Sequence, residues 1–316
     1  MSEQELINTS GRRQDQVTIA QAILHQVNEQ SCATWRLDSR FGSGVRNGAW
    51  RVQAGSSVAV LKWHDPAHSG TAMSVADFNS SSPYNPDTPA VVRYVRSMGY
   101  PTPTWFASGS TAEGVNWSIQ EFVDGQPLSE LDVASAEVFI ELVERQRSLR
   151  PPTVMNWNPY IRAHVFGPHP SHRALIAAAG DVRKLLDHAI SFAAPYEPTP
   201  LLDNEMVHGD LNVSNILMRD GRVVAVVDIE GTGRGCAVYD VLSPAANGVS
   251  WNSDPVAVDR LVGYAIDTYG AGPVAIAVAC LVIETTGWYL TATPAGIEHR
   301  VARHHNWIDD LRPRLE

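Results

Sequence analysis

Short runs of β-branched and aromatic residues alternate with turn residues in the first third of the chain. These runs cover 49–52, 58–63, 100–110 and 115–123. Runs of this length, separated by Gly- and Ser-containing turns, indicate the strands of an antiparallel sheet. Apolar residues recur at helical spacing over 15–27 and 88–99, so we also expect helices there. Asp15 and Gly99 are of the residue types that begin and end helices. Residues 1–14 show no apolar pattern, and we expect them to be loose.

Longer helical patterns dominate the second part of the chain. They cover 134–149, 172–194, 254–270 and 272–292. The segment DGQPL at 124–128 separates them from the strand-rich part, because Gly and Pro interrupt both kinds of pattern. The sequence therefore predicts an α+β fold with two lobes. The small antiparallel-sheet lobe is expected at 1–123, a linker at 124–128 and a mainly helical lobe at 129–316.

The composition is that of a globular protein, with 44% hydrophobic and 18% charged residues. The net charge of −10 disfavours non-specific binding to nucleic acid and suits a cationic ligand. The chain has three cysteines, Cys32, Cys236 and Cys280, far apart in the sequence. They form no disulfide framework or paired metal motif, so we expect a reducing, cytoplasmic environment.

No stretch of the sequence has the pattern of a targeting or membrane-spanning segment. The first 16 residues are polar and lack the apolar centre of a signal peptide. The longest apolar run, Val274–Ile283, has about half of the roughly 20 residues that a membrane helix requires. We therefore expect a buried helix there and no association with a membrane.

The segment HGDLNVSNILMRDGRVVAVVDIE (208–230) gathers polar residues around a predicted hairpin. Asp220 and Gly221 form a dipeptide typical of a tight hairpin turn. Pairing centred on this turn places Asn215 opposite Val226, two residues from Asp228. An amide oxygen and a carboxylate at one end of a hairpin suit Mg²⁺, which takes one or two protein groups together with substrate phosphates.

Asp210, in the loop before this hairpin, is placed to accept a proton from an attacking hydroxyl. The pattern HGDLNVSN (208–215), followed by Asp228, resembles the catalytic and metal motifs of the aminoglycoside phosphotransferase family, small-molecule relatives of the protein kinases. The resemblance implies a two-lobed, protein-kinase-like fold. It also implies that Asp210 is the catalytic base and that Asn215 and Asp228 bind Mg²⁺.

The same resemblance gives supporting roles to three other residues of this region. His208 would hold the catalytic loop in shape. Glu230, in the Asp-x-Glu arrangement after Asp228, is a candidate for a further metal or substrate contact. Asp240 matches an aspartate that braces the catalytic loop, although it could equally begin a helix.

A kinase site also requires residues from the first lobe. Lys62, one of only two lysines in the chain, lies in an apolar strand at the position of the family's nucleotide lysine. The alternative is a lysine on an edge strand that faces solvent. The resemblance also implies that the backbone of Glu121 and Val123, just before the linker, holds the purine of ATP or GTP. An ordinary turn between the lobes is the alternative. The sequence does not distinguish the two nucleotides.

The segment GSGVRNGAWRV (42–52) resembles the family's loop over the nucleotide, with Gly44, Asn47 and Gly48 as candidate contacts. Glycines there let backbone N–H groups approach phosphates. A tight hairpin uses the same residue types, so the alternative of an ordinary turn remains open.

One part of the family pattern is missing. The family pairs the strand lysine with a glutamate on the next helix, but no glutamate occurs between Lys62 and Glu113. Aligning the Pro-x-Pro at 101–103 puts Ala90 at that position. Asp77 and Asp87 are shorter substitutes, and we favour Asp87 as the N-cap of the helix that begins at Thr88.

From the resemblance and the net charge we expect a small-molecule acceptor, and we favour a cationic antibiotic. We also expect the protein to be a monomer or a homodimer. Candidate acceptor contacts are the acidic and indole side chains of the second lobe: Glu230, Asp254, Glu284, Trp288, Trp307, Asp309 and Asp310. A core helix around Glu284 and a solvated C-terminal tail are the structural alternatives. A metabolite kinase acting on choline, an amino alcohol or a sugar remains open, as does a non-catalytic nucleotide-binding regulator.

Overall fold

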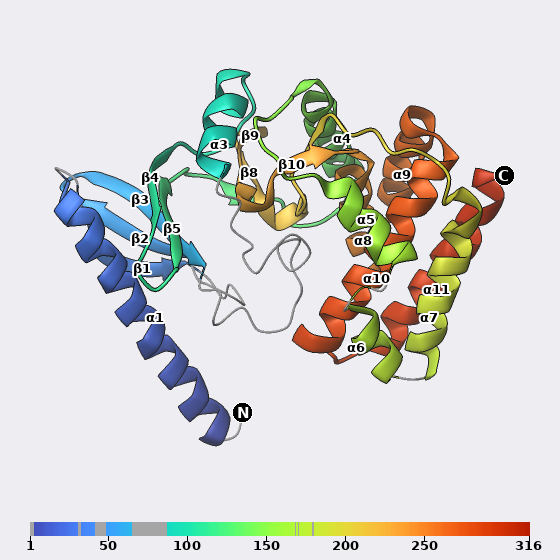
Figure 1. Ribbon diagram of the computed structural model, residues 1–316, viewed down its shortest axis with the longest axis horizontal. Helices are drawn as coiled ribbons and strands as arrows, with labels where there is room; N and C mark the ends of the chain where they lie inside the picture. The colour runs from blue at the N-terminus through green and yellow to red at the C-terminus, as the bar shows by residue number, and fades with distance from the viewer. Residues whose placement is uncertain are drawn as a thin grey trace. The chain divides into compact units, whose positions relative to one another are not determined.

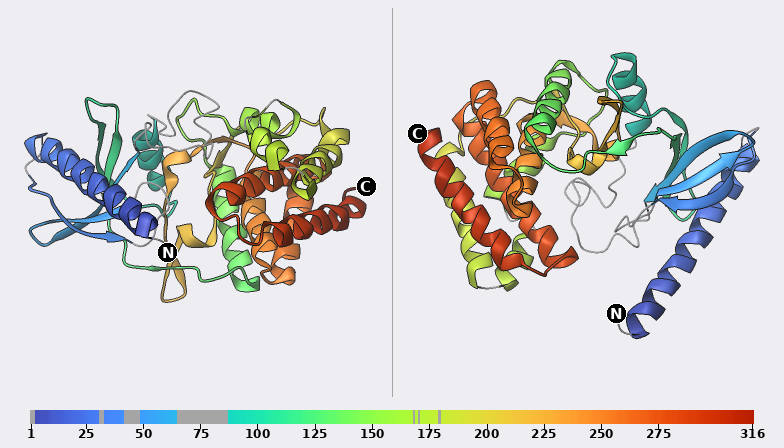
Figure 2. Two further views of the ribbon diagram at one scale, coloured as in Figure 1. Left: turned by 90° about the horizontal axis from the view of Figure 1, so that it is seen from below. Right: turned by 180° about the vertical axis from the view of Figure 1, so that it is seen from behind.

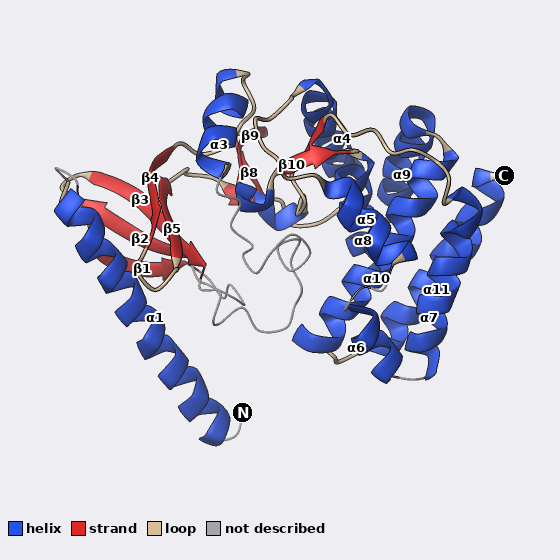
Figure 3. Ribbon diagram, viewed as in Figure 1, coloured by secondary structure: helices blue, strands red, loops and turns tan. Residues whose placement is uncertain are grey.

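The computed structural model describes residues 3–30, 33–41, 49–64, 87–167, 169, 171–178 and 180–316 (Figure 1). They fall into two compact units. Unit 1 lies within Met1–Thr71 and Pro103–Asp124, and unit 2 lies within Ala72–Thr102 and Gly125–Glu316. Unit 1 holds an antiparallel sheet and unit 2 is mainly helical (Figure 3), which confirms the predicted α+β class. The lobe and linker bounds of the sequence analysis stay a prediction.

Unit 1 is built on a five-stranded antiparallel sheet in the order β1-β2-β3-β5-β4. Its strands are β1 (Arg36–Phe41), β2 (Ala49–Ala54), β3 (Ser57–His64), β4 (Trp105–Ser110) and β5 (Asn116–Glu121). Four of the five were expected from the apolar runs. Strand β1 was not expected, because its charged residues show no β pattern. It pairs with β2 from Arg36 to Phe41 around a β-bulge.

The C-terminal half of helix α1 (Glu3–Gln30) packs on the apolar face of this sheet (Figure 2). Ile23, Leu24 and Val27 are buried against strand residues such as Leu61 and Ile119. The helix start expected at Asp15 was wrong, since α1 begins at Glu3. The looseness of the segment 1–14 stays a prediction. Adding residues to a helix that is already formed costs little, so the packed C-terminal half supports turns that the apolar pattern did not reveal.

Helix α3 (Thr88–Ser97) belongs to unit 2 and ends as predicted. Gly99 adopts a left-handed conformation, with φ +82°, and Tyr100 donates its N–H to Val95. The helix also starts at Thr88, as predicted. Asp87 occupies the N-cap position, but its side chain makes no capping bond and accepts the backbone N–H of Val154 instead.

The other helices of unit 2 pack around the long apolar helix α10, except α4, which packs against α8 and α9. They are α4 (Val133–Ser148), α5 (Trp157–Phe166), α6 (Ser171–Ala178), α7 (Gly180–Ala193), α8 (Val238–Trp251), α9 (Pro255–Tyr269), α10 (Ala271–Ala292) and α11 (Ile297–Leu315). One predicted helix is divided into α6 and α7 near Gly180, whose φ of +55° suits glycine. The C-terminal segment is the helix α11 and not a solvated tail.

Helix α10 matches the helix predicted at 272–292 and extends beyond its most apolar run. The stretch Ala271–Leu290 is long and apolar enough to cross a membrane by length and composition. However, 67% of its most apolar window is buried inside the protein, as in the core helix of a globular domain. Its packing against α5, α7, α8 and α11 agrees with the expected buried helix.

Two small sheets carry the polar segment 208–230. The first contains β6 (Gln126–Pro127), β8 (Ile216–Arg219) and β9 (Arg222–Val226), and the second contains β7 (Glu205–Val207) and β10 (Gly233–Gly235). Asp220 and Gly221 form the predicted turn, with φ of 51° and 72°. The predicted register was wrong by one residue, since Ile216 and not Asn215 pairs with Val226. A β-bulge after Leu217 adds one residue to β9 and shifts the pairing.

Candidate active site

A buried carboxylate holds the loop between β7 and β8. Asp240, in the first turn of α8, accepts the backbone N–H of His208 at 2.6 Å and that of Gly209 at 2.9 Å. Asp240 has no exposed surface. Burial raises its pKa to about 7, whereas the two N–H donors favour the ionised form. The N-cap of α8 is Ala237, so Asp240 supports the loop and does not begin the helix.

The His208 ring adds a second fixed point. Its Nε2 lies 3.0 Å from the carbonyl oxygen of Val227, the residue before Asp228. Its Nδ1 accepts the backbone N–H of Asp210 at 3.3 Å. Both contacts are satisfied by the neutral tautomer that carries its proton on Nε2. The fully buried ring therefore joins the loop before Asp210 to the strand end before Asp228.

Two asparagine amides orient the Asp210 carboxylate. Asn212 donates to Oδ1 at 2.8 Å, and Asn215 donates to Oδ2 at 3.1 Å. Asn215 also donates to the main-chain carbonyl of Asp210 at 2.8 Å. Since these bonds use the Asn215 amide nitrogen, the Oδ1 of Asn215 is turned away from Asp210. That oxygen lies 3.5 Å from the Ser214 hydroxyl, at the limit of a hydrogen bond.

Asp228 lies next to this loop in a left-handed backbone conformation, with φ 66° and ψ 37°. Val227 donates its N–H to the carbonyl of Asn215 at 2.8 Å, so the hairpin brings Asn215 and Asp228 to the same end. The surrounding protein atoms and then the charge of Asp228 raise the pKa of Asp210 to about 7. Because Asp210 keeps an exposed surface, water weakens the first cause. A cation bound between the two carboxylates would instead lower the pKa of Asp210, because it would outweigh the charge of Asp228.

The residues at this end of the hairpin fit a hard divalent cation. Asn215 can offer its Oδ1 and Asp228 its carboxylate, which are the oxygen ligands that Mg²⁺ prefers. Among the residues that the structure describes, no group of three or more His, Cys, Asp or Glu could hold a metal ion. The described residues therefore contain no metal site of three or more such side chains. A Mg²⁺ held by two protein groups and by phosphates remains compatible with them.

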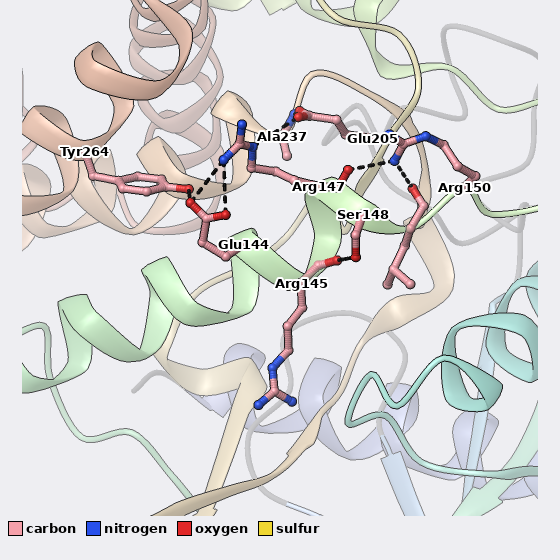
Figure 4. Close-up of polar contacts among 9 residues, drawn as sticks. Glu144, Arg145, Arg147, Ser148, Arg150, Glu205, Ala237 and Tyr264 are labelled. Atoms are coloured by element: carbon pink, nitrogen blue, oxygen red, sulfur yellow. Dashed lines mark hydrogen bonds and ion pairs between the residues drawn. The ribbon is translucent and has the colours of Figure 1, made fainter.

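A second buried carboxylate, Glu205, supports the strand that leads into the catalytic loop. It was not predicted from the sequence. Glu205 in β7 accepts the backbone N–H of Ala237 at 2.9 Å and pairs with Arg147 at 3.4 Å (Figure 4). Arg147 also pairs with Glu144, whose carboxylate accepts the hydroxyl proton of Tyr264. Glu205 thus links the strand before His208 to the start of α8, but no local motif marks it.

Glu284 is the candidate acceptor contact whose charge acts on Asp210. The hydroxyl of Tyr160 donates to its Oε1 at 2.9 Å, and the hydroxyl of Tyr239 donates to its Oε2. The charge of Glu284 also raises the pKa of Asp210, so the two carboxylates lie within electrostatic range. Trp288 lies one turn further along α10 and packs edge-to-face on Tyr289.

Three of the other acceptor candidates have structural roles or lie in the core, and two do not. Asp254 caps α9 by accepting the N–H of Val256 at 2.9 Å. Asp309 pairs with His188 at 3.2 Å across α7 and α11. Trp307 is buried in the core, and Asp310 is exposed on α11. Glu230 follows Asp228 in a short 3₁₀ helix, where its carbonyl accepts the hydroxyl proton of Thr88 at 3.2 Å.

Lys62 lies on the sheet of unit 1, on a central strand. Its strand β3 lies between β2 and β5, so the alternative of an edge-strand lysine was wrong. Leu61 and Trp63 point into the core, and alternation puts Lys62 on the opposite face. There it is paired with Ser118, beside the buried Gln120, whose amide donates to the Ser118 hydroxyl.

Other nucleotide candidates can be placed only in part. Glu121 ends β5, and its carboxylate accepts both the N–H and the hydroxyl proton of Thr104, at 2.9 and 2.7 Å. Val123 follows in the extended segment before Asp124. Gly44, Asn47, Gly48 and Asp77 lie outside the described residues.

The sequence matches the model of the phosphotransferase enzyme family (APH) over residues 39–274, which is more than half of the chain. No curated protein matches the sequence. Solved structures with similar folds include the microcompartment-associated aminopropanol kinase, with 15% identity and a TM-score of 0.67. That match covers 95% of this chain and 99% of the other.

Two antibiotic kinases also have similar folds. A thermostable mutant of aminoglycoside phosphotransferase APH(4)-Ia, in ternary complex with AMP-PNP and hygromycin B, matches with 17% identity and a TM-score of 0.62. The match covers 88% of this chain and 93% of that one. Amicoumacin kinase matches with 12% identity and a TM-score of 0.60, over 98% and 96% of the two chains. The family match and these folds lead to one conclusion: the chain belongs to the phosphotransferase enzyme family and is a small-molecule kinase.

Proposed function

We propose that this protein transfers the γ-phosphoryl group of ATP or GTP to a hydroxyl of a small cationic molecule, most simply an antibiotic. The observation that carries the proposal is the arrangement of Asp210, Asn215 and Asp228. The Asp210 carboxylate is oriented by the amides of Asn212 and Asn215. The hairpin brings the Asn215 amide oxygen and the Asp228 carboxylate to the end beside it. Similar kinases of known structure bind AMP-PNP, and for this chain the use of a nucleotide and of Mg²⁺ is part of the proposal.

Asp210 acts in this proposal as the general base. It accepts a hydrogen bond from the acceptor hydroxyl and takes its proton while the hydroxyl oxygen bonds to the γ-phosphorus. The bond between the γ-phosphorus and the bridging oxygen breaks, and the nucleoside diphosphate leaves. Asn212 and Asn215 hold the carboxylate in one orientation, which is the positioning that phosphoryl transfer requires.

Asn215 and Asp228 would hold Mg²⁺, which neutralises phosphate charge when it is bound. His208 and Asp240 keep the loop and the hairpin end in register through the bonds to Val227 and to the loop backbone. Lys62 would contact the α- and β-phosphates, with the backbone of Glu121 and Val123 on the purine. Gly44, Asn47 and Gly48 remain candidates for phosphate contacts, and the partner of Lys62 is not assigned.

Glu284 is the acceptor contact that we propose. Two tyrosine hydroxyls fix its carboxylate, so it can bind an ammonium group of the acceptor with little loss of side-chain entropy. Its charge lies within range of Asp210. Trp288 and Glu230 remain weaker candidates. The net charge of −10 would also favour the approach of a cation.

A metabolite kinase is the second candidate function, because a carboxylate that binds ammonium suits an amino alcohol as well as an antibiotic. The fold of an aminopropanol kinase is similar to that of this chain. Nucleotide consumption with Mg²⁺ and ATP or GTP, across aminoglycosides, other amine-bearing antibiotics and amino alcohols, separates the two. Mass spectrometry then locates the phosphate on the acceptor. Failure of every ammonium-bearing acceptor, with turnover of a neutral sugar, would overturn the proposed substrate class.

A further inference from the structure

Trp157, to which no sequence motif points, contacts both segments that carry the acidic residues of the site. Its indole N–H donates to the carbonyl of Gly231 at 3.1 Å, three residues after Asp228. Its ring lies against Gly209, the residue before Asp210. A Cβ built on Gly209 would lie 1.9 Å from Cζ2 of Trp157. One buried, rigid ring therefore touches the chain next to Asp210 and next to Asp228.

The Trp157 side chain is itself held in place. It is the first residue of α5, whose N-cap Asn156 accepts the N–H of Asn158. Gly233 also leaves room for the indole, because a Cβ there would lie 2.9 Å from Cδ1. The ring is thus enclosed by helix α5 on one side and by glycine backbone on the other, and it has little freedom to shift.

The same ring contacts the tyrosines that hold the proposed acceptor carboxylate. Trp157 packs edge-to-face on Tyr160 and tilted on Tyr239, with ring centroids 5.1 Å apart in both pairs. The hydroxyls of these tyrosines donate to Glu284. Trp157 is the shared neighbour of the catalytic loop, the segment after Asp228 and the Glu284 group.

We infer that Trp157 is a positioning residue that sets the separation of Asp210 and Asp228, and with it the geometry in which Asn215 and Asp228 bind a divalent cation. This inference rests on the proposed function. Its physical basis is that a ring fixed between two loops resists relative motion of the two, and a shift of about 1 Å at such a site can cost about 100-fold in rate.

Binding of AMP-PNP with and without Mn²⁺, measured by isothermal titration calorimetry, tests the inference without a known acceptor. Mn²⁺ should tighten AMP-PNP binding to the unaltered protein. Trp157→Phe keeps a ring but loses the N–H bond to Gly231, and it should reduce this Mn²⁺-dependent tightening by about 10-fold, which corresponds to one hydrogen bond. Binding of AMP-PNP without metal should be unchanged.

Trp117→Phe is the matched control. Trp117 is a buried tryptophan of unit 1 that also packs on a glycine, since a Cβ on Gly109 would lie 2.8 Å from its Cζ2. Its indole N–H has no hydrogen-bond partner among the described residues. This variant changes a buried indole in the same way without breaking a hydrogen bond, and it should leave the Mn²⁺ effect intact.

Asp228→Asn distinguishes a wrong assignment of the metal ligands from a wrong assignment of Trp157. If Asp228→Asn keeps the full Mn²⁺ effect, the proposed metal ligands are wrong and the inference falls with them. If Asp228→Asn loses the effect but Trp157→Phe retains it, only the positioning role of Trp157 is overturned. Loss of the effect in both variants, with Trp117→Phe unaffected, supports the inference.

Discussion

The carboxylate of Asp240 accepts the backbone N–H of His208 at 2.6 Å, in the interior of unit 2. The two residues are 32 positions apart in the sequence. Since Asp240 also accepts the N–H of Gly209, two consecutive peptide groups of the loop before Asp210 are attached to α8. The position of the proposed base therefore depends on a side chain that does not itself contact the reacting groups.

Asp240→Asn should lower both stability and turnover. The new amide would place N–H groups against one of the two backbone donors, and a hydrogen bond to a charged group would be lost. We expect a loss of about 2–3 kcal/mol in the free energy of unfolding and a decrease in kcat with little change in nucleotide affinity. Urea denaturation and steady-state kinetics measure the two effects. Asp220→Asn, in the exposed turn, is the control, and an equally large effect there would contradict the role given to Asp240.

Gly209→Ala and Gly221→Ala form a second matched pair. Both glycines have positive φ, +88° and +72° respectively, so both substitutions strain the backbone by about 1–2 kcal/mol. Only at Gly209 would the new Cβ also collide with Trp157, whereas nothing lies within 4 Å at Gly221. We expect Gly209→Ala to cost about 1–3 kcal/mol more, by overpacking, and to abolish activity. Equal unfolding free energies for the two variants would show that Trp157 does not press on the loop.

Glu284→Gln should discriminate between acceptors. It removes the charge but keeps a group that can bond to Tyr160 and Tyr239. For an ammonium-bearing acceptor we expect KM to rise by about 10- to 100-fold, the effect of losing a charge-assisted hydrogen bond of about 1.5–3 kcal/mol. For a neutral hydroxyl acceptor KM should change little. Steady-state kinetics with one acceptor of each kind provide the comparison. An unchanged KM for the cationic acceptor would show that Glu284 does not bind the acceptor.

His304 should make the protein sensitive to acid. Burial lowers its pKa from 6.5 to about 4, and its ring nitrogens contact Ser250 and Thr286. Between these two pH values the unfolded state binds a proton that the folded state does not. The stability contributed by His304 is therefore complete above about pH 6.5 and falls by about 3 kcal/mol as the pH decreases to 4.

His304→Gln cannot take up that proton, so its unfolding free energy should decrease less between pH 6.5 and 4 than that of the unaltered protein. Urea denaturation at several pH values measures the difference in slope. Other buried histidines, such as His169, also have lowered pKa values, and their contribution cancels in this comparison. Parallel slopes for the two proteins would contradict the assignment.

The parts of the site that could be predicted are those encoded by local spacing. Asp210 and Asn215 share one short loop, and the Asp220–Gly221 turn brings Asp228 back beside them, so a single segment of sequence specifies the group. The register was wrong by one residue because the bulge in β8–β9 depends on packing and leaves no mark in the sequence.

The residues that could not be predicted act over long sequence separations. Glu205 and Trp157 have no motif, since their roles follow from contacts with Ala237, Gly209 and Gly231 that only the folded chain creates. For Asp254 the structure adds a role that was not predicted, since its half-buried side chain caps α9. Its contact with the acceptor stays a prediction.

The central claim is that Asp210 is the base for phosphoryl transfer, and the most direct test is Asp210→Asn. Turnover with the best acceptor and the affinity for AMP-PNP with Mg²⁺ would be measured for both proteins. The account predicts that turnover falls by about 100- to 10,000-fold, while AMP-PNP affinity stays within a few-fold. A variant that retained near-normal turnover, with the acceptor phosphorylated at the same hydroxyl, would contradict it.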